Sequence, residues 1–539
     1  GRLDIAAAAS FYEDRDAQPR FNDQGGIFVF LQYEDGFLDD PDQILLGLTL
    51  TEEGWVGQEK QSLQLGIDMA AGDIDADGFC DLAVGAHRLR LNDRNNSGGA
   101  FIYKGRPADA LSQGGLTELP VIAYAAMEDG GNGATFGRRL SLGHLDGDGY
   151  LDLVVGANAW DANRATERGS NIRGLLSAGG VFVFSGGPLP SLPAYEFTSI
   201  LDANWIYEET TSYSNAGISV DVGDVNGDGR DDLLLGSYTS NYPGEPNVGV
   251  VRVFFQTEGS LPESLVPDIE WKGLYGRHRL GEAVVALSDL NADGWSDVAA
   301  YATYDNHDGY RAGNGYVFLT DAPQPASDAV DLAAVGGSAD SGVVEVADQM
   351  GGPLGGGVGA DGVESAETAA TEFRLNRPHR PAGARFGTDV ALVGDINGDG
   401  FEDAVVTAPF VAVEADGLRG GAGLIFPGTS TGFAQSCENN TDCPVGDCVN
   451  GLCSPQSIRV SGFLGHTASD LVWNVTSVGD FNGDGFPDFA LLLRDDEAPS
   501  PGNGTNNLNN NYRKGSEDCR STTRRNASGS VYIFLGRDD

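Results

Sequence analysis

An acidic nonapeptide recurs six times and constrains the fold more than any other feature of the chain. The first copy reads Asp-Ile-Asp-Ala-Asp-Gly-Phe-Cys-Asp at 73–81, and later copies begin at residues 144, 224, 289, 395 and 480. An aliphatic run follows each copy, and a second run of β-branched and aromatic residues comes further along, as at 249–255. Since Gly and Asn bound these short runs and no long helical periodicity is present, the repeat predicts an all-β protein.

The first residues of the chain match the end of the same motif. Residues 1–7, Gly-Arg-Leu-Asp-Ile-Ala-Ala, align with residues 149–155, Gly-Tyr-Leu-Asp-Leu-Val-Val, which suggests a seventh repeat. Seven repeats in 539 residues allow about 77 residues each, enough for a four-stranded blade with its loops. We therefore expect residues 1–539 to form a single seven-bladed β-propeller, trimmed at both termini.

The spacing of oxygen-bearing side chains predicts a Ca²⁺ site in each nonapeptide. Ca²⁺ takes about six to eight oxygen ligands, which positions one, three, five and nine and the carbonyl of position seven would supply, while Gly at position six allows the turn. An EF-hand would place Glu at position twelve on a helix, but that position is apolar in every copy, as at Val84 and Leu235. The alternative is an acidic turn that is capped by its own backbone.

The predicted ligands comprise five residues from each copy. They are Asp73, Asp75, Asp77, Phe79 and Asp81; His144, Asp146, Asp148, Tyr150 and Asp152; Asp224, Asn226, Asp228, Arg230 and Asp232; Asp289, Asn291, Asp293, Trp295 and Asp297; Asp395, Asn397, Asp399, Phe401 and Asp403; and Asp480, Asn482, Asp484, Phe486 and Asp488. Because His is a poor ligand for a hard cation, the His144 site is expected to be weak or empty. The expected cofactor is Ca²⁺, at about five or six sites.

Charge and cysteine usage place the protein outside the cell. The chain has 79 acidic and 33 basic residues, a net charge of −46, which argues against nucleic-acid and anionic-lipid partners. Four cysteines cluster at Cys437, Cys443, Cys448 and Cys453 without the spacing of a zinc ribbon, so we expect two local disulfides within an insert at 432–458. No apolar stretch is long enough to cross a bilayer, so no membrane insertion is expected in this segment.

Two further regions bear on function. Residues 321–372 are rich in Gly, Ala and acidic side chains, which predicts a flexible insert. The connections opposite the Ca²⁺ loops carry many aromatic residues, which predicts a face that binds a protein or glycan, although such residues also seal blade junctions. These aromatic residues are Trp55, Trp160, Trp205, Tyr207, Tyr213, Tyr238, Tyr242, Trp271, Tyr275, Tyr301, Tyr304 and Tyr310.

The repeat resembles the FG-GAP repeats that form the β-propeller of integrin α-subunits. The dipeptide that names the family is present at 136–137 and 386–387 as Phe-Gly, with relaxed Leu-Gly versions at 65–66 and 280–281. The resemblance implies a Ca²⁺-binding propeller. Similar repeats also occur in bacterial surface proteins and in secreted phospholipases and polysaccharide lyases, so the resemblance leaves the activity open.

Evidence for catalysis is weak in the sequence. The Gly-Thr-Ser-Thr-Gly segment at 428–432 matches a nucleophile elbow, but that motif needs a strand–turn–helix and a Cys-rich loop follows here. The six His residues are scattered. We therefore expect a non-catalytic, Ca²⁺-stabilised, secreted or cell-surface propeller that binds a protein or glycan in adhesion or surface assembly. The alternative is the propeller of a secreted polysaccharide lyase or hydrolase.

Overall fold

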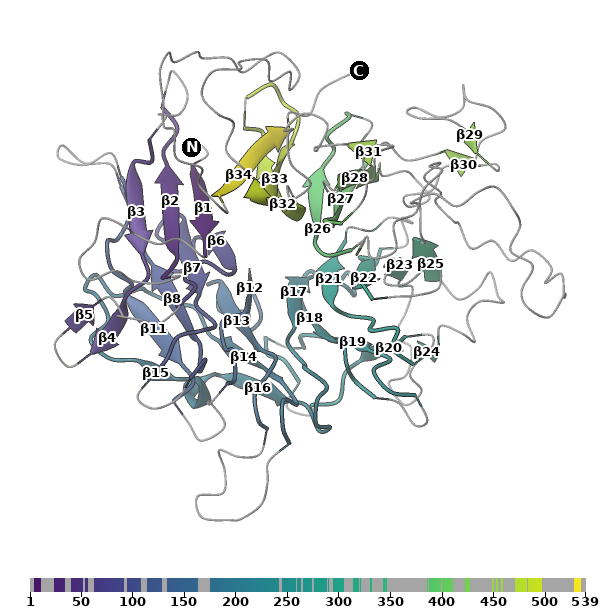
Figure 1. Ribbon diagram of the computed structural model, residues 1–539, viewed down its shortest axis with the longest axis horizontal. Coiled ribbons are helices and arrows are strands. Elements are labelled where there is room, and N and C mark those ends of the chain that lie inside the picture. The colour runs from purple at the N-terminus through teal and green to yellow at the C-terminus, as the bar shows by residue number, and fades with distance from the viewer. Residues whose placement is uncertain are drawn as a thin grey trace, which may run out of the picture. The chain divides into compact units, whose positions relative to one another are not determined.

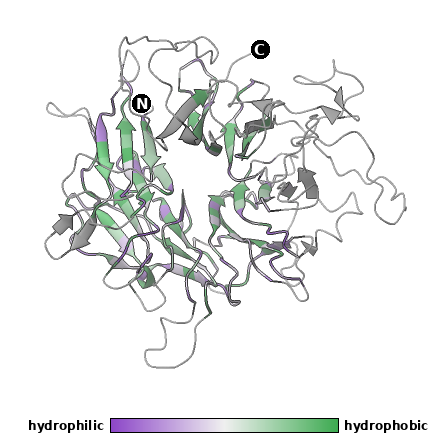
Figure 2. Ribbon diagram, in the orientation of Figure 1, coloured by the Kyte–Doolittle hydropathy of each residue, from purple (hydrophilic) through white to green (hydrophobic). Residues whose placement is uncertain are grey.

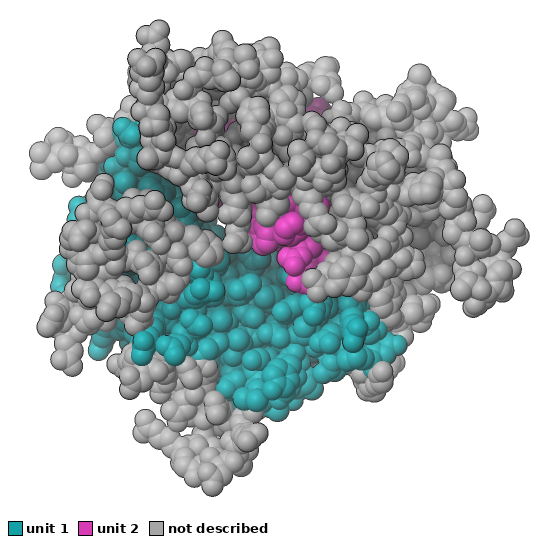
Figure 3. Space-filling view, in the orientation of Figure 1, with its two compact units in different colours: residues 1–286, 322–332 teal, residues 287–321, 333–539 magenta. Residues whose placement is uncertain are grey.

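A computed structural model of the chain describes residues between 4 and 534, with gaps. The longest gaps are 11–23, 163–174, 305–313, 321–329, 332–342, 347–384, 411–421, 427–447, 459–470 and 497–527. Two compact units are distinguished (Figure 3): unit 1 contains residues 1–286 and 322–332, and unit 2 contains residues 287–321 and 333–539. The two units are described separately below.

Unit 1 consists of small, mainly antiparallel sheets (Figure 1). One sheet pairs β1 (Ile5–Ala9), β2 (Gly26–Phe30) and β3 (Gln43–Leu46). The next has the order β15-β11-β8-β7-β6, from β6 (Met69–Gly72), β7 (Asp81–Gly85), β8 (Gly99–Tyr103), β11 (Ile122–Ala125) and β15 (Thr198–Ser199). A third contains β12 (Arg139–Gly143), β13 (Asp152–Ala157), β14 (Gly180–Phe184) and β16 (Trp205–Glu208).

The fourth large sheet of unit 1 has the order β17-β18-β19-β20-β24. Its strands are β17 (Ser219–Gly223), β18 (Asp232–Ser237), β19 (Val250–Phe254), β20 (Ile269–Lys272) and β24 (Val330–Asp331). Smaller elements are the pairs β4 (Thr49–Thr51) with β5 (Gly54–Val56) and β9 (Gly105–Arg106) with β10 (Gly115–Leu116), strand β21 (Ala283–Ala286), and a 3-10 turn at Ile200–Asp202.

Unit 2 repeats this construction (Figure 1). It contains β22 (Val298–Ala302), β23 (Asn314–Phe318) and β25 (Val343–Val346), then β26 (Val390–Gly394), β27 (Asp403–Ala408), β28 (Ala422–Phe426) and β31 (Ser457–Ile458). It also has the pair β29 (Cys448–Val449) and β30 (Leu452–Cys453), and a sheet of β32 (Leu471–Gly479), β33 (Asp488–Asp496) and β34 (Ser528–Phe534). The described part of the chain is therefore all-β, as predicted.

The core of unit 1 lies between neighbouring sheets. Ala83 of β7 belongs to one buried cluster together with Leu153 of β13 and Phe182 of β14. The adjacent residue in β7, Leu82, belongs to another cluster with Ile27 of β2. Since successive side chains of a strand point to opposite faces, this sheet has a packed neighbour on each side. The arrangement explains why the central strands are apolar at nearly every position (Figure 2).

The Phe-Gly dipeptide joins one sheet of unit 1 to the sheet before it. Phe136 is fully buried and forms a parallel bridge with Gly98, the residue before β8. Gly98 has a φ of +87°, and a Cβ atom there would lie 2.1 Å from the carbonyl oxygen of Phe136. A Cβ atom on Gly85 would lie 1.9 Å from the carbonyl oxygen of Gly137. The dipeptide therefore marks a close backbone approach that requires glycine on the opposing sheet.

Both inserts predicted from the sequence lie largely outside the described residues. Within 321–372 the structure describes only β24 and β25, and within 432–458 only β29, β30 and β31. Cys448 and Cys453 are register partners in the β29–β30 pair, whereas Cys437 and Cys443 are not described. Cys80 is a free, exposed thiol. The flexible insert and the two disulfides therefore remain predictions.

Asp221 connects three strands of unit 1, β12, β17 and β21, through its carboxylate. One oxygen accepts a hydrogen bond from the Ala286 amide of β21 at 2.9 Å, and the other from the Ser141 hydroxyl of β12 at 3.2 Å. Burial raises the pKa of Asp221 to about 6, although these hydrogen bonds and one from Val222 act in the opposite direction. The ionised carboxylate is therefore costly in the folded state.

This raised pKa predicts a stability change with pH. The folded state favours the protonated Asp221 side chain, and this preference adds to the free energy of unfolding. The added stability is fully present below the unfolded-state pKa of 3.8 and is lost as the pH rises through about 6. The loss amounts to at most roughly 3 kcal/mol. We expect wild type and Asp221→Asn to differ in free energy of unfolding by an amount that changes between pH 4 and pH 6 and is constant above pH 7. Urea unfolding across this range measures it, and a pH-independent difference would contradict the assignment.

Candidate metal sites in the acidic loops

The nonapeptides connect the first and second strands of the sheets. They lie between β6 and β7, β12 and β13, β17 and β18, β26 and β27, and β32 and β33, and the fourth copy directly precedes β22. We refer to them as loops one to six in chain order. The structure describes every predicted ligand of loops one to three. In loops four to six, Asn291, Asp293, Asp399 and Asn482 lie outside the described residues.

Position six of the loops needs glycine for its backbone conformation. These glycines have φ between +84° and +95°, and a Cβ atom on any of them would meet nothing within 4 Å. The requirement therefore comes from the left-handed turn and not from lack of space. The glycines concerned are Gly78, Gly149, Gly229, Gly294, Gly400 and Gly485.

Position one organises the turn through its carboxylate. In loop one, Asp73 accepts hydrogen bonds from the amides of Asp77 and Gly78 at 2.9 and 2.8 Å. Asp224 and Asp480 make the same pair of contacts in loops three and six. These bonds hold the loop closed by tying position one to the backbone of positions five and six.

Position nine is the most buried part of each loop. Asp81 is 1 % exposed, and the equivalent carboxylates of the other five loops are fully buried. One oxygen of Asp81 accepts from the Ile74 amide at position two, at 2.9 Å, and the other accepts from the Gly105 amide just beyond β8, at 2.7 Å. Asp152 and Asp232 repeat this arrangement. The position-nine side chain thus fastens the loop to the third strand of its sheet.

Burial also changes the acidity of the position-nine side chains. It raises the pKa of Asp81 and Asp152 to about 6 and that of Asp232 to about 7, against the lowering effect of their backbone hydrogen bonds. Neighbouring carboxylates within the same loops add to the rise. A cation bound among these groups would favour their ionised form, because an opposite charge lowers the pKa of a carboxyl group.

Two loops bring three carboxylates together closely enough to hold a metal ion. Carboxylate oxygens of Asp73, Asp75 and Asp81 in loop one all lie within 4.8 Å of one another, as do those of Asp146, Asp148 and Asp152 in loop two. In the remaining described loops, position three is Asn, which supplies a neutral oxygen; Asn226 Oδ1 accepts from the Asp228 amide at 2.9 Å. Oxygen ligands of this kind suit a hard divalent cation such as Ca²⁺.

Loop one also contains a buried oxygen with no partner. The Asp75 side chain is 3 % exposed, and among the described residues its Oδ1 atom has no hydrogen-bond donor. An unpaired, buried carboxylate oxygen is costly unless a cation or donor is present. Because Asp75 belongs to the loop-one triad, the residues of this loop fit a bound cation.

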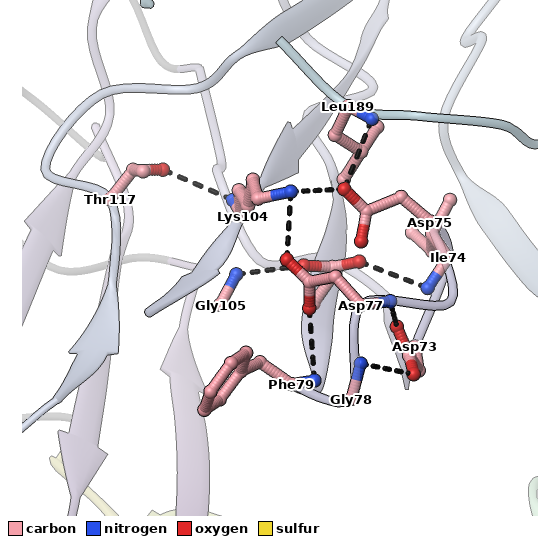
Figure 4. A network of polar contacts seen from close by, with 11 residues as sticks. Asp73, Ile74, Asp75, Asp77, Gly78, Phe79, Lys104, Gly105, Thr117 and Leu189 are labelled. Atoms are coloured by element: carbon pink, nitrogen blue, oxygen red, sulfur yellow. Dashed lines mark hydrogen bonds and ion pairs between the residues drawn. The ribbon is translucent and has the colours of Figure 1, made fainter. Parts of the chain in front are cut away.

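A lysine that the sequence interpretation missed contacts loop one from outside it. Lys104 follows β8, and its ammonium group contacts Asp75 and, at 2.9 Å, Asp77 (Figure 4). Lys104 directly precedes the residue whose amide binds the position-nine Asp, and the corresponding residues of the next two repeats are Ser185 and Phe255. That relation between distant segments becomes visible only with the strand pairing.

His144 is positioned differently from the Asp residues that begin the other loops. Its Nδ1 atom lies 2.8 Å from the carbonyl oxygen of Tyr150, the position-seven group expected to bind the cation. His144 is not part of the loop-two carboxylate triad. Loop two therefore gathers Asp146, Asp148 and Asp152 without a fourth side chain from position one.

The predicted aromatic face needs correction. Trp160 is fully buried, and Tyr207 of β16, Trp271 of β20 and Tyr301 of β22 are at most 5 % exposed. These four residues belong to the cores between strands, so their expected exposure on a binding face was wrong. Tyr213 is 57 % exposed. The remaining predicted residues include Tyr242, Tyr275 and Tyr310, which lie outside the described part of the chain, and Trp55, whose side chain is not described.

Two of the predicted aromatic residues form cation–π contacts with arginines. The guanidinium carbon of Arg279 lies 5.7 Å from the ring centroid of Tyr238 in unit 1. In unit 2, that of Arg385 lies 5.2 Å from the ring centroid of Tyr304.

Among the described residues, no helix has the length and apolar character needed to span a bilayer.

Comparison with known proteins identifies the repeat. The FG-GAP repeat model matches residues 136–184, 216–254 and 386–425. Integrin alpha-5 of Xenopus laevis is 33% identical over 159 residues, which cover 29% of this chain and 13% of the relative. Integrin alpha-IIb of Mus musculus is 41% identical over 119 residues, or 21% of this chain and 11% of the relative.

A second kind of relative is an enzyme by name. Phosphatidylinositol-glycan-specific phospholipase D of Rattus norvegicus is 26% identical over 259 residues, covering 44% of this chain and 27% of the relative. The chain thus matches between about a tenth and a quarter of the length of these three relatives. It carries FG-GAP repeats and is distantly homologous to integrin α-subunits and to phosphatidylinositol-glycan-specific phospholipase D.

Proposed function

We propose that the chain is a seven-bladed β-propeller whose acidic loops bind Ca²⁺ and whose surface binds a protein or glycan outside the cell. The observation that carries the Ca²⁺ assignment is the loop-one triad with its buried, unpartnered Asp75 Oδ1. The ligands would be the residues at positions one, three, five and nine and the carbonyl of position seven. Ca²⁺ would neutralise these clustered carboxylates and tie each loop to its sheet.

The seven-bladed form is supported by the repeated pattern. Five described sheets have a loop between their first and second strands, the fourth loop precedes β22, and residues 1–7 match the end of the same motif. Sheets stacked face to face through alternating core clusters are what a propeller requires.

The extracellular location rests on the ion and on the relatives. Ca²⁺ sites of extracellular modules have dissociation constants of roughly 10⁻⁴–10⁻³ M, so they would be occupied at about 1 mM free Ca²⁺ and empty at cytosolic concentrations. Integrins, which are cell-surface proteins, are among the homologues. Both considerations support the proposed secretion or surface display of this chain.

The binding surface is placed at the ends of the strands opposite the acidic loops. In an antiparallel sheet, the connection from the fourth strand to the next first strand lies at the other end from the connection between the first and second strands. Tyr213, in the β16–β17 connection, is therefore at the end away from the Ca²⁺ loops and is exposed. The Arg279–Tyr238 pair offers a cation and an aromatic ring in the same unit.

A binding screen with matched tyrosine variants tests this placement. The purified chain in 2 mM Ca²⁺ is applied to an array of acidic and neutral glycans and to immobilised extracellular-matrix proteins. We expect saturable binding that Tyr213→Ala weakens about tenfold, the usual effect of removing an aromatic anchor. Tyr195, 77 % exposed in the β14–β16 connection at the loop end of the sheet, provides the control. Equal effects of Tyr213→Ala and Tyr195→Ala would contradict the assigned surface.

A hydrolase or lyase is the second candidate, because one homologue is a phospholipase by name. It is tested with a glycosylphosphatidylinositol-anchored reporter on vesicles and with an acidic polysaccharide. We expect neither release of the reporter nor new unsaturated sugar ends above the rate without protein. Turnover that depends on protein concentration would replace the binding function with catalysis.

A further inference from the structure

Lys104 is held next to loop one by contacts of both its backbone and its side chain. Its amide donates to the Thr117 hydroxyl at 3.1 Å, which fixes the start of the side chain. Its ammonium group then contacts the carboxylates at positions three and five, Asp75 and Asp77 (Figure 4). The Lys104 side chain is 19 % exposed, so its charge is partly removed from water.

The ammonium group remains charged in this position. Burial by itself would lower the pKa of Lys104, but the hydrogen bonds and charges of Asp75 and Asp77 raise it above its ordinary value. The same contact lowers the pKa of Asp77. Lys104 and the two carboxylates are thus an ion-paired cluster within the metal-binding loop.

Lys104 compensates for a difference in charge between the loops. Loop one has four carboxylates, at Asp73, Asp75, Asp77 and Asp81, because position three is Asp and position one is also acidic. At the same four ligand positions each of the other loops has three, because Asn occupies position three or, in loop two, His144 occupies position one. The ammonium group therefore brings the ligand side chains of loop one to the same formal charge as those of the others, although loops three and five carry a further acidic residue at position eight, Asp231 and Glu402.

We propose that Lys104 is a built-in counter-ion of loop one that competes with Ca²⁺ for Asp75 and Asp77. A cation entering loop one must displace the ammonium group from positions three and five, whereas the other described loops have no lysine in the corresponding place. Loop one therefore keeps its closed form without Ca²⁺ and binds the ion more weakly than its four carboxylates alone would allow. This inference rests on the Ca²⁺ binding proposed above.

The test compares Lys104→Met with a matched cation elsewhere. Arg106 is exposed in β9, two residues beyond Lys104, and is not one of the predicted ligands. Arg106→Met thus removes a nearby cation that solvent already screens. Ca²⁺ binding is followed by calorimetric titration of the metal-free chain, and thermal unfolding is recorded in chelator.

We expect Lys104→Met to bind Ca²⁺ at one site about three- to tenfold more tightly than wild type, because a competing charge is gone. Its unfolding midpoint in chelator should fall below that of wild type, since four carboxylates then repel one another. Arg106→Met should change neither quantity. In the double variant Lys104→Met/Asp73→Asn, the tightened site should be lost, which assigns it to loop one.

The outcomes separate this inference from the function on which it depends. If the wild-type chain binds no Ca²⁺, the proposed metal function fails. If wild type binds Ca²⁺ and Lys104→Met shows equal or weaker binding, the competition by Lys104 is overturned. Lys104→Gln, which keeps a polar end group, is measured in parallel in case the methionine variant does not fold. Tighter Ca²⁺ binding by Lys104→Gln would likewise support the competition, and equal or weaker binding would overturn it.

Discussion

Removal of Ca²⁺ is expected to lower the thermal unfolding midpoint of the chain by several degrees. At about 1 mM free Ca²⁺, a site with an extracellular-type dissociation constant stabilises the folded state by about 0.4–1.4 kcal/mol. Five such sites would together contribute about 2–7 kcal/mol, comparable with the net stability of an ordinary domain. Without the ion, the carboxylates gathered in loop two repel one another, and those of loop one are countered only by Lys104.

Calorimetry in 1 mM Ca²⁺ and in excess chelator measures this effect. Re-addition of Ca²⁺ above the chelator concentration should restore the midpoint, whereas Mg²⁺ at the same concentration should restore little of it, because Mg²⁺ demands a tighter octahedral site. An unchanged midpoint on chelation would mean that the loops are turns capped by their own backbone.

Replacement of a position-nine carboxylate should be the most damaging single change in a loop. Asp232 is fully buried and accepts hydrogen bonds from the amides of Val225, Asn226 and Gln256, at 3.0, 3.2 and 2.9 Å. Asp232→Ala leaves these donors without an acceptor, and each such group costs about 1–3 kcal/mol. We expect a loss of about 3–5 kcal/mol in free energy of unfolding, measured by urea denaturation in Ca²⁺ at pH 7.

A surface aspartate supplies the control for this variant. Asp202 is exposed in the 3-10 turn, so Asp202→Ala should change the free energy of unfolding by less than about 0.5 kcal/mol. If Asp232→Ala were as mild as Asp202→Ala, the position-nine side chain would not be what fastens the loop to the third strand.

The parts of this architecture that depend on local geometry were predictable from the sequence. The left-handed turn at Gly78 and its equivalents follows from residues in immediate sequence, and the strand runs on either side follow from their composition. The dipeptide at 136–137 was recognisable as a marker, but its contact with Gly85 and Gly98 was not, since these residues belong to the preceding sheet.

The parts that depend on packing between distant segments were not predictable in this way. Trp160 and Tyr207 look like loop or edge aromatics in sequence, but each is buried among residues from another strand or sheet. Lys104 follows its loop by more than twenty residues, and only the pairing of β7 with β8 returns it to Asp75 and Asp77. A single sequence records neither relation.

Direct counting of bound Ca²⁺ tests the central claim that the acidic loops are metal sites. The metal-free chain is dialysed to equilibrium against 2 mM Ca²⁺, and the bound ion per chain is determined by elemental analysis. We expect about five or six Ca²⁺ per chain, with loop two the one in doubt because His144 replaces the first carboxylate. The removal of Asp73 and Asp77 together should lower the count by one. A count near zero at this concentration would contradict the account.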